Sequence, residues 1–286
     1  MIQSLGVGAA LAEQHSADRR AREAYDALAF AYDAFTAGYA HQLWLERLEA
    51  LARSFGLAGN RVLDVACGTG KSFLPLLGRG YEVTGCDISE SMLRIARGKA
   101  PEVRLVRADM RALPVFGAFD LVTCLDDALN YVDTEDELSA GLTGIARQLA
   151  PGGLALWDVN TLGFYRRDFA SQWAIERDGM FMVWRGNARA NHPPGAAAWA
   201  DVDVFSPAGE GYRRTRSRHH QRHWPPAAVL ACAERAGLRV LATYGQLRGA
   251  TLEADLDELR HIKAVYLACP MTAEGRGGDR VSIGSP

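Results

Sequence analysis

Short apolar runs alternate with helical segments from residue 61 onward, and this alternation constrains the fold more than any other feature. The expected strands lie at 61–66, 82–87, 103–109, 119–125 and 154–160, and the expected helices near 71–79, 89–99 and 134–150. Strands that alternate with helices build a parallel sheet covered by helices on both faces. The last of these helices is expected to begin at Thr134, because Glu137 stands at the capping-box spacing.

The segments on either side of this region follow different patterns. Apolar residues at helical spacing predict two helices within 16–55. Period-two alternation and proline-glycine turns predict a small antiparallel sheet within 161–222. A helix at 225–237 and strands at 238–244 and 264–269 return to the core pattern. The expected units are 1–55, the core 56–160, the insertion 161–222, the return to the core sheet 223–270 and a flexible tail 271–286.

Composition and charge argue against several classes of protein. The chain has 286 residues, of which 48% are hydrophobic and 23% charged, as in an ordinary globular protein. A net charge of −2 offers no general attraction to nucleic acid or to an anionic membrane. No stretch reaches the roughly 18 uninterrupted apolar residues of a membrane span. Five scattered cysteines without a C-x-x-C pair indicate reduced thiols, and therefore a cytoplasmic protein.

A glycine turn follows the first strand, where residues 62–70 read VLDVACGTG. Backbone amides in such a turn face a ligand at the carboxyl edge of the sheet, and glycine leaves room for that ligand. The second strand ends in Asp87, whose carboxylate can accept hydrogen bonds from two ribose hydroxyls. The third strand ends in Asp109 at the same edge, where it can meet an adenine. This arrangement predicts a nucleoside site.

Three kinds of nucleoside ligand compete for this turn. A Walker A loop requires a glycine at position 65, which is Val65, although Gly70, Lys71 and Ser72 fit the end of that motif. A dinucleotide fingerprint requires a third glycine near position 73, which is Phe73. S-adenosylmethionine has no phosphate and needs only the shorter turn, so it is the interpretation that remains.

Four segments in this order resemble the class I methyltransferase superfamily, namely 62–70, 83–95, 107–113 and 149–153. The resemblance covers about residues 20–160 and extends more loosely to 269. It implies a Rossmann-like seven-stranded sheet with helices on both faces, with S-adenosyl-L-methionine as cofactor and S-adenosyl-L-homocysteine as product. The cofactor-binding residues that it implies are Tyr32, Trp44, Asp64, Ala66, Cys67, Gly68, Gly70, Asp87, Ile88, Met92, Asp109, Met110, Leu125 and Asp126.

A narrower resemblance points to a branch that methylates small molecules and inserts a β-layer after strand five. It rests on Tyr-Asp at 25–26 and 32–33, on CLDDALNY at 124–131 and on H-x-x-R-x-W at 219–224. It implies that residues 1–55 form lid helices and that 161–222 cover the substrate. The substrate candidates are Trp199, His219 and Arg222, and the candidates for positioning or proton handling are Tyr32, Asn130, Tyr131 and His219.

The expected function is methyl transfer from S-adenosylmethionine to an amine, hydroxyl or aromatic carbon of a metabolite, such as those of natural-product biosynthesis. No metal is expected, because His219, His220 and His223 have no fitting carboxylate or thiolate nearby. The expected protein is a monomer or homodimer that binds neither nucleic acid nor membrane. Two alternatives stay open: a nucleic-acid methyltransferase, and a non-catalytic protein that binds S-adenosylmethionine.

Overall fold

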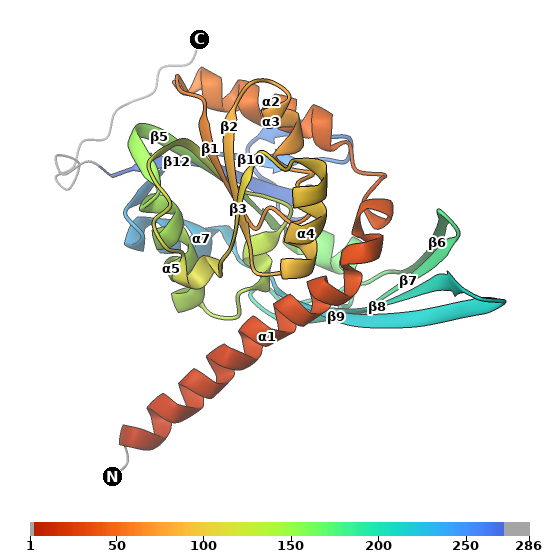
Figure 1. The fold of residues 1–286 in the computed structure, drawn as a ribbon. Helices are drawn as coiled ribbons and strands as arrows, with labels where there is room; N and C mark the ends of the chain where they lie inside the picture. The colour runs from red at the N-terminus through yellow and green to blue at the C-terminus, as the bar shows by residue number, and fades with distance from the viewer. Residues whose placement is uncertain (1–2, 272–286) are drawn as a thin grey trace.

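A central sheet of eight strands carries the rest of the fold. The computed structural model describes residues 3–271, with side chains from residue 19, so the tail expected at 271–286 lies almost wholly outside the described residues. The strands are β1 (Arg61–Val65), β2 (Glu82–Asp87), β3 (Arg104–Arg107), β4 (Phe119–Cys124), β5 (Leu149–Asn160), β10 (Leu238–Gln246), β11 (Leu252–Ala254) and β12 (Lys263–Pro270). Their order in the sheet is β11-β10-β12-β5-β4-β1-β2-β3 (Figure 1).

Helices cover both faces of this sheet. They are α1 (Gln3–Phe35), α2 (His41–Ser54), α3 (Leu74–Leu77), α4 (Glu90–Lys99), α5 (Glu135–Ala146), α6 (Leu162–Phe164) and α7 (Pro226–Arg235), with the short turns η1 (Met110–Ala112), η2 (Ala128–Tyr131) and η3 (Tyr165–Phe169). Neighbouring residues of β1 face opposite sides. Val62 packs in a cluster with α2 and α4, and Leu63 packs in a second cluster with α5 and α7.

The five strands from β1 to β5 run parallel, and β12 is antiparallel to both β5 and β10. Strands covered on both faces have continuous apolar sequences, and the last eight residues of β5 are all buried. The expected Rossmann-like α/β class is confirmed. The sheet has one strand more than the seven expected, because the three-residue β11 pairs with β10.

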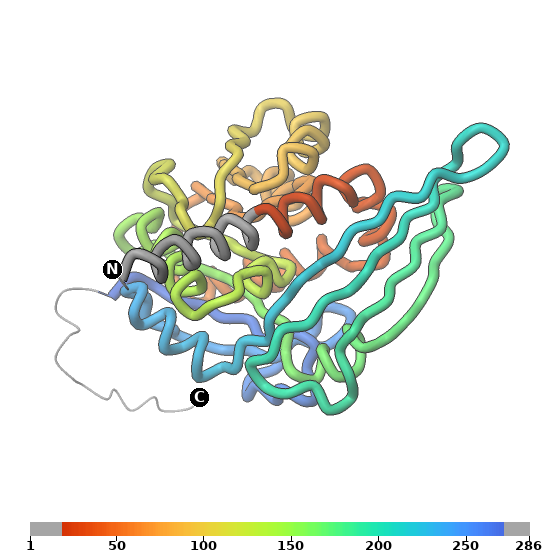
Figure 2. The backbone as a smooth tube through the Cα atoms, turned by 90° about the horizontal axis from the view of Figure 1, so that it is seen from below, coloured from red at the N-terminus to blue at the C-terminus, as the bar shows by residue number. Residues whose placement is uncertain are grey.

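A second sheet, separate from the first, is formed by β6 (Gln172–Arg177), β7 (Met180–Gly186), β8 (Ala197–Ala208) and β9 (Gly211–Arg222). It is antiparallel throughout and projects from the body of the molecule beside α1 (Figure 2). Leu28 and Ala31 of α1 pack against Val202 of β8 in an apolar cluster. One face of this sheet therefore closes over α1.

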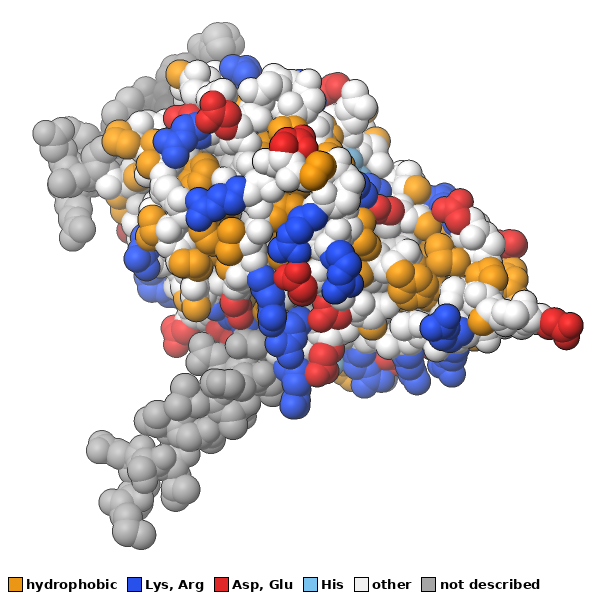
Figure 3. Space-filling model, in the orientation of Figure 1, with side chains coloured by type: hydrophobic (Ala, Val, Ile, Leu, Met, Phe, Trp, Pro, Cys, Tyr) orange, Lys and Arg blue, Asp and Glu red, His pale blue; other side chains and the backbone are white. Residues whose placement is uncertain are grey.

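The opposite face of the second sheet carries basic side chains, which gather along its underside (Figure 3). Arg216 and Arg218 pair with Asp201 at 2.8 and 2.7 Å, and Arg214 pairs with Asp203 at 2.7 Å. Two aspartates of β8 thus form ion pairs with three arginines of the neighbouring strand β9. These ion pairs stabilise the alternating arginines of β9 on the outer face, whereas Ser217 and His219 are buried on the inner face.

Gly186 lets the second sheet dock against η3. A Cβ at this position would lie 1.5 Å from the Phe169 carbonyl oxygen. We expect Gly186→Ala to lower the free energy of unfolding by about 3 kcal/mol, because the backbones must separate. Gly211→Ala, where a Cβ meets nothing within 4 Å, is the matched control. Denaturant unfolding of both variants tests this. Equal free energies of unfolding for the two variants would contradict the close contact between Gly186 and η3.

Candidate functional site

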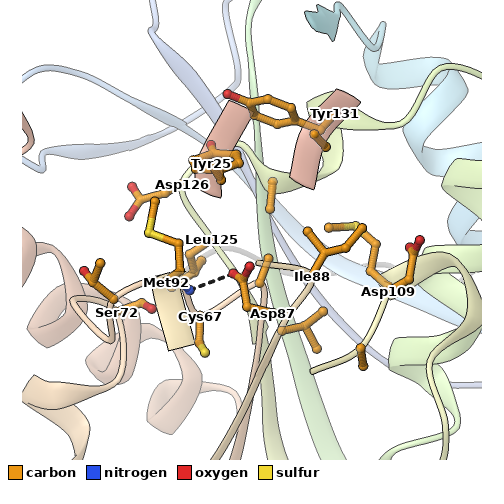
Figure 4. A pocket seen from close by; sticks show the side chains of 18 of the residues that line it. Tyr25, Cys67, Ser72, Asp87, Ile88, Met92, Asp109, Leu125, Asp126 and Tyr131 are labelled. Carbon is orange, nitrogen blue, oxygen red and sulfur yellow. Dashed lines mark hydrogen bonds between the residues drawn. The ribbon is translucent and has the colours of Figure 1, made fainter. Parts of the chain in front are cut away.

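A pocket of about 880 Å³ lies at the carboxyl edge of the central sheet, below the second half of α1 (Figure 4). Its walls come from the ends of β1, β2 and β4, from the segment after β3, from η2 and from α1. The carboxyl edge of a parallel sheet is where α/β folds bind small ligands and cofactors. The cofactor candidates that line it are Tyr32, Ala66, Cys67, Gly68, Asp87, Ile88, Met92, Asp109, Met110, Leu125 and Asp126.

The Asp87 carboxylate joins the turns that follow β1 and β2. Its Oδ2 accepts the Gly68 N–H and its Oδ1 accepts the Ser89 N–H, each at 2.8 Å (Figure 4). A carboxylate oxygen has two lone pairs, so each oxygen keeps one acceptor position for a ligand hydroxyl. Burial raises the pKa of Asp87 to about 6. The group is therefore mostly ionised at neutral pH and able to accept two ribose hydroxyls.

The turn after β1 leaves open space beside its backbone. Ala66, Gly68 and Gly70 have φ values of 58°, 53° and 89°, which only glycine adopts without strain. A Cβ at Gly68 would meet nothing within 4 Å, so a ligand can approach the main chain there. At Gly70 a Cβ would lie 2.7 Å from the ring of Phe73. The side chain that replaces the third glycine of a dinucleotide motif thus fills the space under this turn.

The far end of the pocket combines a fixed carboxylate with apolar side chains. Asp109 accepts the Arg111 backbone N–H at 3.0 Å and pairs with the Arg111 guanidinium at 2.6 Å. That guanidinium also pairs with Glu137 at 3.2 Å. Burial raises the pKa of Asp109 above its usual range. With Ile88 and Met110 alongside, this end offers an apolar surface and one carboxylate acceptor to an adenine.

The tip of β4 holds two consecutive left-handed residues, Asp126 and Asp127, with φ values of 59° and 56°. This conformation costs of the order of 1–3 kcal/mol for a residue other than glycine, and such strain is concentrated at functional sites. Hydrogen bonds to Asp158 offset this strain, because its carboxylate accepts the backbone N–H groups of Asp126 and Asp127, each at 2.8 Å. Lys263 in turn donates to Asp158 at 2.7 Å and to Asp127 at 3.2 Å.

The pKa values of the two carboxyl groups of this turn are shifted in opposite directions. Burial opposes ionisation of Asp126, but a 2.9 Å hydrogen bond with His41 and the charge of Lys263 lower its pKa below the usual range. Burial raises the pKa of Asp127, and the neighbouring Asp126 adds to this rise against the charge of Lys263. Three carboxylates, counting Asp158, thus share the single Lys263 ammonium. The turn carries an excess of negative charge.

A second pocket of about 630 Å³ adjoins the first and lies between α1 and the second sheet. The two pockets share Tyr25, Tyr32, Asp126 and Tyr131, so they meet at this wall. The remainder of the second pocket is largely aromatic or apolar, with Leu28, Phe35, Tyr39, Phe164, Phe169 and Trp184. Its other polar side chains are Thr36, His41, Asp127, His219 and Gln221. The two pockets are therefore neighbours with four lining residues in common.

Tyr131 and His219 form a hydrogen-bonded pair at this wall. The Tyr131 hydroxyl lies 3.0 Å from Nδ1 of His219, and Nε2 of the same ring lies 3.1 Å from the Ser217 hydroxyl. Burial lowers the pKa of His219 to about 4, so the imidazole is neutral at physiological pH. Tyr25 packs edge-on against His219, with ring centroids 5.3 Å apart. His219 therefore orients the Tyr131 hydroxyl and holds no charge itself.

Several candidates do not line either pocket: Trp44, Asp64, Gly70, Asn130, Trp199 and Arg222. Trp44 packs in the core, with the Lys263 ammonium 5.5 Å from its ring centroid, and does not cover the first pocket as expected. Trp199 lies on the outer face of the second sheet, where 39% of it is exposed. Aromatic content predicts burial or contact but not the direction of a side chain, so it could not indicate that these two tryptophans lie outside the pocket linings.

Of the remaining four, Gly70 belongs to the turn after β1, and the other three have structural partners. Asp64 accepts hydrogen bonds from the hydroxyls of Ser72 and Thr123 beneath the turn, and burial raises its pKa to about 7. Asn130 donates to the Arg222 carbonyl and accepts the Asn160 N–H, which fixes η2 against β5 and β9. Arg222 donates to the Asp133 carbonyl at 2.8 Å and so lies outside the second pocket.

Sequence reasoning missed four residues of the shared wall and its support: Tyr25 as a lining residue, His41, Asp127 and Lys263. The seven-residue spacing of Tyr25 and Tyr32 indicated one helix face, which is the available signal. Asp127 adjoins the candidate Asp126 in the sequence, and it lines the second pocket. Nothing near Lys263 in the sequence marks it, since its partners are 105 or more residues away.

Two further findings concern the described part of the chain. Within residues 3–271, no helix is both long and apolar enough to cross a membrane. Among the side chains described, no group of three or more histidine, cysteine, aspartate or glutamate residues has an arrangement that suits a metal ion.

Comparison with known proteins places this site in a family. Residues 62–153 match the family model described as "Methyltransferase domain". The chain is 30% identical to the dTDP-3-amino-3,4,6-trideoxy-alpha-D-glucopyranose N,N-dimethyltransferase of Streptomyces venezuelae over 197 residues, covering 66% of this chain and 80% of that protein. It is also 30% identical to the Cypemycin N-terminal methyltransferase of Streptomyces sp over 210 residues, covering 71% and 82%.

The fold has solved counterparts as well. The crystal structure of a S-adenosylmethionine-dependent methyltransferase from Clostridium acetobutylicum ATCC 824 matches with a TM-score of 0.73. The match covers 85% of this chain and 97% of that one at 20% identity, and so shows a shared fold. With the matched domain and two relatives covered over most of their length, the conclusion is direct: this chain belongs to the class I S-adenosylmethionine-dependent methyltransferases.

Proposed function

We propose that the first pocket binds S-adenosylmethionine and that the second binds a small acceptor whose nucleophile is an amine. The observation that carries the proposal is the wall shared by the two pockets, where Tyr32, Asp126 and Tyr131 border both. A methyl group at this wall would face an acceptor without either ligand leaving its pocket. Holding the reacting atoms about 3 Å apart and in line is the main contribution of the protein to such a transfer.

The residues of the first pocket fit the cofactor in three respects. Asp87 keeps two acceptor positions for ribose hydroxyls, Gly68 leaves its backbone open to the ligand, and Ile88 with Asp109 suits an adenine. Leu125 and Asp126 would border the methionyl half, and Tyr32 would cover it from α1. When bound, S-adenosylmethionine supplies a methyl group on a sulfonium, whose sulfur leaves as a neutral thioether and needs no acid.

The charge of the second pocket favours an amine over a phosphorylated or carboxylated group. Asp126 and Asp127 line it, and no lysine or arginine is found in its lining among the described residues. An ammonium would be attracted to these carboxylates and to the faces of the surrounding aromatic rings. Two relatives support the same chemistry, since their names state N,N-dimethylation of an amino sugar and methylation of an N-terminus.

Asp127 and Tyr131 would prepare the acceptor for attack. An ammonium must lose a proton before its nitrogen becomes a nucleophile, so a base is needed. Asp127 is suited to this because its pKa is raised by burial. In the His219 tautomer whose Nδ1 carries no hydrogen, the Tyr131 hydroxyl would donate a hydrogen bond to Nδ1, and the phenol oxygen could then accept one from the acceptor N–H. Asn130, earlier a candidate, would act only by holding η2 in place.

The proposal extends to the partners. The aromatic lining of the second pocket and the net charge of −2 favour a small molecule over nucleic acid, and we propose a cytoplasmic enzyme that works as a monomer or homodimer. Incubation with methyl-labelled S-adenosylmethionine and separate pools of primary amines, alcohols and RNA tests this by mass spectrometry. We expect label on amine nitrogen. Label confined to RNA, or turnover with alcohols alone, would overturn the acceptor class.

Loss of the Asp87 carboxylate is predicted to weaken cofactor binding strongly. Asp87→Ala removes the acceptor of two ribose hydroxyls, which corresponds to about 2–3 kcal/mol, or roughly 30- to 150-fold in affinity for S-adenosylhomocysteine. Calorimetry on the folded variant measures this. An unchanged affinity would show that the ribose lies elsewhere.

The affinity for S-adenosylhomocysteine is also predicted to depend on pH. The pKa of Asp87 is about 6 in the free protein, and the ionised form accepts the ribose hydroxyls. Affinity should therefore fall as the pH drops below about 6, by up to tenfold per unit, because the proton must first be displaced. Calorimetry from pH 5 to 8 tests the slope. Asp87→Ala should flatten it, and an equal slope in both proteins would assign it to another group.

The acceptor step is predicted to depend on Asp127. Asp127→Asn should lower kcat/KM for an amine acceptor by about 100-fold, or ~2.7 kcal/mol, because the pocket loses its base and a negative charge. Tyr131→Phe should lower it about tenfold. Affinity for S-adenosylhomocysteine should change less than threefold in both. Asp178→Asn, at an exposed left-handed turn, is the matched control, and full activity of Asp127→Asn would refute the assignment.

A further inference from the structure

Two residues that line neither pocket, Asp158 and Lys263, lie directly behind the wall shared by both. Asp158 is near the end of β5 and Lys263 begins the antiparallel neighbour β12, opposite Asn160. Asp158 is fully buried and 6% of Lys263 is exposed. Burial of an ionised pair is unfavourable unless its hydrogen bonds are satisfied. A buried pair is therefore weak evidence of a stabilising role, and the contacts of these two residues indicate another role.

The contacts of Asp158 account for the unusual backbone in front of it. Its two oxygens accept the N–H groups of Asp126 and Asp127, each at 2.8 Å. Both of those residues have positive φ, a conformation that side chains other than glycine rarely adopt. A bidentate acceptor placed behind the turn holds two successive N–H groups pointing backward. The carboxylates of Asp126 and Asp127 are thereby directed forward, to the pocket walls that they line.

Lys263 completes this arrangement from β12. Its ammonium donates to Asp158 at 2.7 Å and to Asp127 at 3.2 Å, and it lies 3.9 Å from Asp126. One cation therefore contacts all three carboxylates of the turn. Its fourth neighbour is the ring of Trp44, whose centroid is 5.5 Å away. Trp44, which lines neither pocket, borders the cation that holds the turn.

We propose that Asp158 and Lys263 are positioning residues that hold the Asp126–Asp127 turn so that Asp126 faces the amino-acid end of the cofactor pocket. This inference rests on the proposed binding of S-adenosylmethionine in the first pocket. It assigns selectivity to residues that touch no ligand: the pair should matter for ligands with an amino-acid ammonium and not for those with the adenosine half alone. Neither residue is catalytic, since neither borders the reacting atoms.

Two ligands separate this role from general stabilisation. S-adenosylhomocysteine carries the amino-acid end, whereas 5′-methylthioadenosine keeps the adenosine thioether and lacks that end. In Asp158→Asn one turn N–H loses its acceptor, and in Lys263→Met three carboxylates lose their cation. We expect both variants to bind S-adenosylhomocysteine at least tenfold more weakly, with methylthioadenosine affinity within twofold of the parent protein. Lys263→Arg keeps the charge and should recover most of the affinity for S-adenosylhomocysteine.

Calorimetry measures the affinity of the full-length parent and variant proteins for both ligands. The control is Asp178→Asn, which changes an exposed aspartate that also has a left-handed backbone conformation. Equal weakening of both ligands would reduce the pair to a structural role and overturn the proposal, as would unchanged affinity for S-adenosylhomocysteine. Failure of Lys263→Arg to recover affinity would overturn the part assigned to charge. A parent protein that binds neither ligand would instead refute the proposed function of the first pocket.

Discussion

The contact on which the cofactor site depends is the pair of hydrogen bonds from Gly68 and Ser89 to the Asp87 carboxylate. It joins the turns after β1 and β2, which parallel strands bring to the same edge of the sheet. Because only one lone pair of each oxygen is used, the same group can stabilise the empty turns and receive a ribose. Its burial explains both its rigidity and its raised pKa.

The acceptor site depends on segments that are far apart in the chain. Tyr32 comes from α1, Asp127 from the tip of β4 and His219 from β9, and they meet because α1 packs between the core and the second sheet. Hydrogen bonds anchor α1 over the first pocket: Asp26 accepts the Ser89 hydroxyl at 2.6 Å and Asp33 accepts the Thr69 hydroxyl at 2.7 Å. Helix α1, which covers the first pocket, is thus hydrogen-bonded to the two turns that line the pocket after β1 and β2.

Local patterns predicted the parts of the site that local sequence determines. The turn at 62–70 and Asp87 at the end of β2 follow from strand ends and glycine geometry, and the structure brings them together. Residues whose role depends on distant partners could not be predicted in this way. Lys263 is 105 residues from Asp158, and a lone lysine at the start of a strand carries no signal. Trp44 and Trp199 line neither pocket, and residue type alone does not reveal which way a side chain points.

The central claim is that two pockets meet at one wall and that the methyl group is transferred across it. A crystal structure with S-adenosylhomocysteine bound tests this most directly. The account predicts ribose hydroxyls on Asp87 and a thioether sulfur at the wall formed by Tyr32 and Tyr131, facing the second pocket. An adenosine bound elsewhere, or a sulfur that faces away from the second pocket, would contradict it.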